Sequence, residues 1–101
     1  MQSASDRTTI VGLLSRHRDE LRRRFGIARL ALFGSAARDQ LRADSDNDLL
    51  VDFEGSANFD RYVAAADYLE ALLGRRVDLV TEKGLRPRAR VEVEKDLVRV
   101  A

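Results

Sequence analysis

Apolar residues recur along the chain with two different spacings, and each spacing predicts a different kind of element. Over residues 8–25 they recur every three or four positions between charged residues, which is the pattern of an amphipathic helix. A second helical pattern follows Asn58, a residue type favoured at helix N-caps, and ends at Gly74. The apolar faces comprise Ile10, Leu13, Leu14, His17, Leu21 and Phe25 in the first helix and Phe59, Tyr62, Val63, Ala66, Leu69 and Leu73 in the second. We expect both helices to cover the same side of a sheet.

Short apolar segments between the helices predict the strands of that sheet. Three segments of five to seven residues end at glycine or polar positions, as buried strands do: residues 27–33, 48–53 and 77–81. The polar stretch 35–47 has room for one short helical turn. Pro87 is placed to begin a last helix, and residues 97–100 predict a short closing strand. Helices therefore alternate with strands, which predicts the α/β class with a small sheet covered by helices.

Size and composition narrow the range of functions. The 101 residues suffice for a single domain, 1–101, and 45% of them are hydrophobic, as in a folded protein. Charged residues make up 35% of the chain, yet the net charge is only +1, which argues against a nucleic-acid or membrane surface. No apolar run is long enough to span a membrane, and the N-terminus lacks the order of a signal peptide, so we expect a cytoplasmic protein.

Cysteine is absent and histidine occurs once, so thiolate and multi-histidine metal sites are excluded. Any metal must be held by oxygen atoms, which favours Mg²⁺ or Mn²⁺. Asp46 and Asp48 lie two residues apart at the start of a predicted strand, where a period of two places both carboxylates on one face. Their mutual repulsion is relieved by a shared divalent cation or a pair of them. Two residues are candidates for a third carboxylate: Asp52, with the same strand parity, and Asp78, the only charge within the segment VDLVT.

Gly34 and Ser35 end the first predicted strand, just before the short helical turn. Backbone N–H groups and a hydroxyl at such a place suit a phosphate group, and glycine leaves space for the ligand. Arg38 follows one turn later. It is positioned either to reach a triphosphate or to pair with Asp39 or Asp44 at the surface.

These residues together resemble a known family. Gly34-Ser35, ten further residues and then Asp46-x-Asp48 resembles the signature of the DNA polymerase beta-like nucleotidyltransferases. The wider sequences SAARD, SDNDLLVDF and LGRRVDLVTEKGLRPR are similar to the minimal nucleotidyltransferase (MNT) subgroup. The resemblance implies the nucleotidyltransferase fold, a small mixed sheet with helices packed against it. It also implies that Gly34 and Ser35 hold the triphosphate of ATP, and that Asp46, Asp48 and Asp78 hold two Mg²⁺ ions and act in catalysis.

The same resemblance implies a partner. MNT proteins are often antitoxins encoded beside a HEPN-domain ribonuclease toxin, and the implied reaction transfers AMP from ATP to a tyrosine of that toxin. An acceptor that brings its own recognition surface suits so small a chain. Two alternatives stay open: a binding-only antitoxin that masks its toxin sterically, and nucleotidyl transfer to a small molecule or an RNA end.

Overall fold

The computed structural model describes residues 6–40, 46–55 and 58–100, and these form a mixed sheet flanked by helices. The strands are β1 (Ile27–Phe33), β2 (Asn47–Phe53), β3 (Val77–Thr81) and β4 (Val98–Arg99), in the order β3-β2-β1-β4. β1 is antiparallel to both β2 and β4, whereas β3 is parallel to β2. The α/β class and the small mixed sheet predicted from the sequence are thus confirmed.

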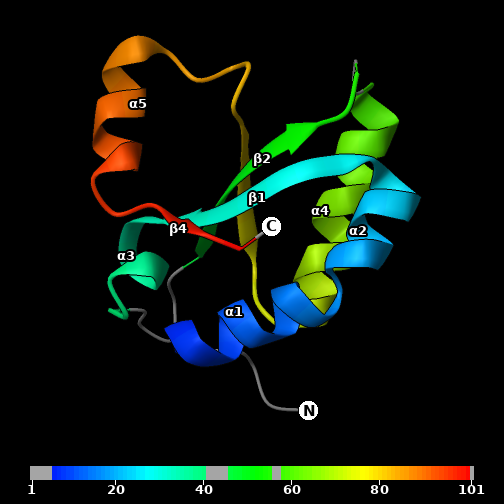
Figure 1. Ribbon diagram of the computed structural model, residues 1–101, viewed down its shortest axis with the longest axis horizontal. Helices are drawn as coiled ribbons and strands as arrows, with labels where there is room; N and C mark the ends of the chain where they lie inside the picture. The colour runs from blue at the N-terminus through cyan, green and yellow to red at the C-terminus, as the bar shows by residue number, and fades with distance from the viewer. Residues whose placement is uncertain (1–5, 41–45, 56–57, 101) are drawn as a thin grey trace.

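Helices lie on both sides of the sheet, in unequal numbers (Figure 1). The helices α1 (Arg7–Arg16), α2 (Arg18–Phe25) and α4 (Phe59–Leu73) pack together on one face. The other face carries α5 (Pro87–Glu94), and the one-turn helix α3 (Gly34–Ala37) follows β1 at the end of the sheet. Among the residues that the structure describes, no helix is long and apolar enough to cross a membrane. The cytoplasmic location stays a prediction.

The single helix predicted over residues 8–25 is wrong in one respect, because the structure has two helices that meet at His17. The backbone of His17 leaves helical geometry, with φ −102° and ψ 10°. Its ring Nδ1 lies 2.8 Å from the carbonyl oxygen of Leu13, within hydrogen-bonding distance of a backbone group of the helix. The ring also meets Tyr68 edge-on, with the ring centroids 6.4 Å apart. His17 is therefore a half-buried residue that packs between α1 and α4. The spacing of the apolar residues does not reveal the helix break at this position.

The core lies between the sheet and the three helices α1, α2 and α4. Alternate residues of the strands point into it, among them Leu32, Leu49 and Leu79, together with Leu69 of α4. Phe59, which the helical spacing assigns to the inner face of α4, is 77% exposed. It is the first residue of the helix, so we attribute its exposure to a position beyond the packed part of the face.

The outer edge of β3 is covered by two side chains of α4. The Tyr62 hydroxyl donates a hydrogen bond to the carbonyl oxygen of Leu79, and the Glu70 carboxylate accepts one from the N–H of Val77 at 2.9 Å. Both backbone groups face away from β2, so they belong to the exposed edge of the sheet. Covering an edge in this way protects it from pairing with another chain.

Candidate active site

The face of the sheet turned away from α1, α2 and α4 carries most of the predicted chemistry. Cross-strand register arranges its side chains in three rows. The acid row consists of Asp78, Asp48 and Phe33; the apolar row of Val80, Leu50, Ala31 and Arg99; and the ion row of Glu82, Asp52 and Arg29. Neighbouring rows are about 7 Å apart, because each step is two residues along a strand.

Asp48 and Asp78 are direct neighbours in the acid row. Asp48 of β2 and Asp78 of β3 are register partners in the parallel pair, so their side chains leave the same face of the sheet side by side. Asp52 also lies on this face, but its carboxylate pairs with Arg29 at 3.3 Å in the ion row. Of the two candidates for a third carboxylate, the register thus places Asp78 beside Asp48 and Asp52 two rows from Asp78.

The electrostatics of Asp48 reflect this crowding. Partial burial raises the pKa of the Asp48 carboxyl above its usual value, and the negative charges of Asp78 and Asp46 raise it further. The positive charge of Arg38 acts in the opposite direction. Asp46 lies just before β2 and is exposed. Asp46 and Asp78 are therefore both close enough to Asp48 to disfavour its ionised form.

Gly34 brings the backbone after β1 against the same carboxylate. Its φ is +68°, and a Cβ built on its Cα would lie 2.5 Å from Asp48 Oδ2, closer than any side chain tolerates. The turn therefore needs glycine both for its backbone geometry and for its closeness to the acid row. Ser35 follows directly, and no side chain within the described part of the chain caps the start of α3.

The turn is anchored from α1. The guanidinium of Arg7 donates to the carbonyl oxygen of Ala37 at 3.0 Å, and the backbone N–H of Arg7 donates to Asp39 Oδ1 at 2.9 Å. Asp39 itself lies just after α3 and adopts a left-handed backbone conformation with a φ of 59°. These contacts fix α3, and with it Gly34 and Ser35, at the end of the sheet.

Arg38 lies beside the site with its guanidinium already paired. Its Nη1 contacts Asp96 Oδ2 at 2.7 Å, and its Nε donates to Gln40 Oε1 at 3.2 Å. The partners considered from the sequence were Asp39 and Asp44. Asp39 bonds Arg7 instead, and Asp44 lies outside the described residues. Asp96, which follows α5, is a contact that the sequence did not predict.

The carboxylate oxygen atoms of the acid row are of the ligand type that suits a hard divalent cation. Carboxylate oxygens are preferred ligands of Mg²⁺. Burial first, and then the charges of Asp78 and Asp46, disfavour the ionised form of Asp48, and a bound cation would favour that form. As the side chains stand, no group of three or more His, Cys, Asp or Glu within the described ranges is arranged to hold a metal ion. A cation would therefore have to draw Asp46, Asp48 and Asp78 together. Bound there, it would supply charge neutralisation to a phosphate group.

Asn47, which the sequence analysis placed at the end of the polar stretch 35–47, is a buried residue of β2 that was not singled out from the sequence. Asn47 begins β2 and is completely buried on the helix-facing side, between the two exposed or half-exposed acids. Neither atom of its side-chain amide has a hydrogen-bond partner in the part of the chain that the structure describes. Strict alternation along DND, with the acids facing outward, would have predicted an inward position for this residue.

With a mixed sheet, an acid row and a glycine turn against it, the architecture is that of an enzyme that handles nucleotides. The chain belongs to the nucleotidyltransferase domain family, which it matches over residues 14–100. It is accordingly a nucleotidyltransferase.

Within that class the chain is similar to minimal nucleotidyltransferases. Protein adenylyltransferase MntA of Thermococcus cleftensis is 46% identical over 77 residues, which are 76% of this chain and 78% of that protein. A solved structure described as a minimal nucleotidyltransferase is 39% identical, with a TM-score of 0.80, covering 96% of this chain and 98% of its own.

A more distant likeness is to a chain from the structure of a tri-AMPylated Shewanella oneidensis HEPN toxin in complex with an MNT antitoxin. It is 19% identical, with a TM-score of 0.65, and the match covers 90% of this chain and 71% of that one. This likeness shows a shared fold. The predicted family and fold are thus confirmed.

Proposed function

We propose that this nucleotidyltransferase uses Mg²⁺ to transfer AMP from ATP to a tyrosine hydroxyl of a HEPN-domain ribonuclease toxin, for which it is the antitoxin. The observation that carries the proposal is the pairing of Asp48 and Asp78 in one row beside the Gly34 turn. The relative with the name protein adenylyltransferase and the AMPylated HEPN toxin in the complex with an MNT antitoxin support the choice of acceptor. The proposal treats residues 1–101 as one minimal nucleotidyltransferase domain.

Each residue has a part in the proposed reaction. Gly34, Ser35 and Arg38 bind the triphosphate. Asp46, Asp48 and Asp78 would hold two Mg²⁺ ions, which would neutralise negative charge on the phosphates. The tyrosine oxygen forms a bond to the α-phosphorus of ATP, and the bond from that phosphorus to the oxygen bridging the β-phosphate breaks. Pyrophosphate leaves with the electron pair of that bond, and the phenolic proton passes to Asp78 and then to solvent. Catalysis comes mainly from positioning and from neutralising charge on the phosphates.

The test uses the full chain, ATP, Mg²⁺ and a HEPN-domain toxin, which is first sought in the neighbouring reading frame. Mass spectrometry of the toxin should show an increase by whole AMP units, located on tyrosine by peptide mapping. Asp46→Asn and Asp48→Asn should each lower the rate by at least about 100-fold, as expected for groups that stabilise transition-state charge. An unmodified toxin after prolonged incubation with the wild-type protein would refute the proposed activity.

The binding-only antitoxin remains the second candidate, because the described acids form no preassembled three-ligand group. A masking protein needs its surface and not its carboxylates. If Asp48→Asn still protects cells from the toxin as well as the wild-type protein does, neutralisation is steric. If the variant binds the toxin but fails to protect, turnover is required.

A further inference from the structure

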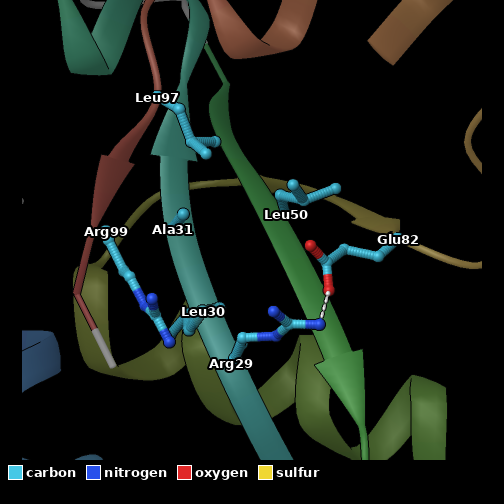
Figure 2. Close-up of a pocket in the computed structure, with 7 residues that line it drawn as sticks. All are labelled: Arg29, Leu30, Ala31, Leu50, Glu82, Leu97 and Arg99. Atoms are coloured by element: carbon cyan, nitrogen blue, oxygen red, sulfur yellow. Dashed lines mark ion pairs between the residues drawn. The ribbon is translucent and has the colours of Figure 1, made fainter.

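A small hollow lies on the face of the sheet turned away from α1, α2 and α4. It is at the apolar row, next to the acid row. Its volume is about 100 Å³. Its apolar wall is formed by Ala31, Leu50 and Leu97, and its charged rim by Arg29, Glu82 and Arg99 (Figure 2). Figure 2 shows Leu97, Ala31 and Leu50 across the near face, with the Arg29–Glu82 ion pair, 3.2 Å long, beside them. We call this the Leu50 hollow.

The geometry points to the Leu50 hollow as the seat for the aromatic ring of the acceptor's phenol, so that the hollow selects a phenolic hydroxyl over an aliphatic one. This inference rests on the proposed function and names the surface that would choose its acceptor.

The position of the hollow relative to the acids carries the argument. Leu50 is two residues beyond Asp48 on the same strand and the same face, so the hollow begins about 7 Å from the acid row. A phenol ring lying on Leu50 and Ala31 can extend its hydroxyl along β2 to Asp48 and Asp78. A serine or threonine hydroxyl on a chain docked at the same place is too short to reach that row.

The size of the hollow limits what it can take in. It is smaller than the apolar cavity of about 150 Å³ that encloses a benzene molecule, so it would seat one edge of a single ring and leave the rest of the ring at its opening. A bicyclic base with its ribose is too large for it. The lining also suits a ring, since the floor is aliphatic and a polar group is wanted only at the end that faces the acids.

Leu97 is an apolar side chain that remains partly exposed to solvent. It is 39% exposed, although it lines the hollow together with the buried Leu50 and Ala31. Burying it beneath an aromatic ring would remove apolar surface from water, which favours binding. Val91, on α5, is 59% exposed but does not line the hollow.

Charge around the hollow indicates what flanks the phenol. The hollow and the shallow pocket beside it, which shares Arg29 and Glu82, are lined by four cations and two anions. The cations are Arg29, Arg99, Lys83 and Arg90, and the anions are Asp52 and Glu82. Within the described residues Arg99 has no ion-pair partner. A segment with acidic residues beside its tyrosine is therefore the complementary acceptor.

A binding experiment tests the hollow without any catalysis. Methyl signals of the full-length protein are followed by NMR during titration with p-cresol, a tyrosine side-chain mimic, and separately with adenosine. We expect p-cresol to shift the signals of Ala31, Leu50 and Leu97 and to leave that of Val91 in place. If p-cresol leaves all three unchanged, or if adenosine shifts them instead, the inference is wrong.

A kinetic experiment tests its use in the reaction. Leu97→Ser should raise KM for the toxin about five- to tenfold, more than it changes KM for ATP, as expected for a lost apolar contact of one side chain. The matched control Val91→Ser should leave KM for the toxin unchanged. Equal KM values for the two variants would overturn the inference while AMP transfer stands. If the wild-type protein transfers no AMP at all, the proposed function fails and the p-cresol titration alone decides the hollow.

Discussion

The Cα of Gly34 lies against the carboxylate of Asp48, so that a Cβ at residue 34 would come within 2.5 Å of Oδ2. Gly34 also has a φ of +68°, a backbone conformation that residues with a Cβ rarely adopt. The backbone that we propose to hold a triphosphate and the carboxylate that we propose to hold Mg²⁺ are thus fitted together without room for one methyl group. Adding that group must either push Asp48 aside or displace the turn.

We therefore expect Gly34→Ala to reduce AMP transfer by about 100-fold, since a displacement on the order of 1 Å at a reacting group has that effect. It should also lower the free energy of unfolding by about 1–2 kcal/mol from backbone strain alone. Transfer assays and urea denaturation measure the two effects separately.

Gly55 supplies the matched control. It has the same φ of +68°, but a Cβ there would meet no atom of the described residues within 4 Å. Gly55→Ala should therefore show the backbone strain without the loss of transfer. A similar loss of transfer in both variants would mean that the contact with Asp48 is unimportant.

The raised pKa of Asp48 predicts how stability depends on pH in the metal-free protein. Burial is the largest cause of the increase, followed by the charges of Asp78 and Asp46. Between the unfolded value and the raised folded value, the folded state binds more protons than the unfolded state. The free energy of unfolding must then fall as pH rises through that window.

Above this pH range Asp48 is ionised in the folded protein as well, and its charge lowers the free energy of unfolding by the full amount. Asp48→Asn should consequently have a higher melting temperature than the wild-type protein at pH 7 in EDTA, and a flatter profile through the window. Mg²⁺ should narrow the difference by stabilising the wild-type protein. A variant less stable than the wild type at neutral pH would contradict the assigned electrostatics.

Local signals in the sequence predicted most of the elements correctly. Asn58 does cap α4, accepting a hydrogen bond from the N–H of Arg61 at 2.7 Å, and Gly74 ends that helix in left-handed geometry. These features depend on one or two neighbouring residues, which is why they can be predicted. The break at His17 could not, because the apolar spacing continues across it.

The composition of the acid site could not be predicted from the periodicity of the sequence alone. Asp52 and Asp78 both fit the strand pattern, and only the register between strands shows that Asp78 lies beside Asp48 while Asp52 pairs with Arg29. The contact between Arg38 and Asp96 joins residues 58 positions apart in the chain, and no spacing signals it. The family resemblance favoured Asp78, but the geometry comes from tertiary structure.

Removing the Tyr62 hydroxyl should weaken the protected edge of β3. The hydroxyl bonds the Leu79 carbonyl oxygen, and burial raises the pKa of Tyr62. Tyr62→Phe leaves that carbonyl without its donor, so we expect the free energy of unfolding to fall by about 1 kcal/mol. Chemical denaturation measures it. Unchanged stability would show that water replaces the hydroxyl at no cost.

The pair formed by Arg38 and Asp96 predicts a competition. If Arg38 binds the triphosphate, the same guanidinium that contacts Asp96 at 2.7 Å must turn part of its donor set to phosphate. Both side chains are partly exposed, so the pair itself stabilises the fold by less than about 1 kcal/mol, and phosphate can displace it. Asp96→Asn should then lower KM for ATP about two- to threefold, since the released arginine no longer has to leave a carboxylate.

Arg38→Lys should have the opposite effect on ATP binding, because an ammonium group lacks the planar fork that binds two phosphate oxygens at once. Initial rates at varied ATP concentration measure KM for each single variant and for Asp96→Asn combined with Arg38→Met, which removes the charge. If Arg38 is where the Asp96 effect arises, Asp96→Asn has no further effect on KM in the Arg38→Met background. If Asp96→Asn raises KM instead, Asp96 orients Arg38 toward the triphosphate rather than competing for it, and α5 becomes a support for the nucleotide site.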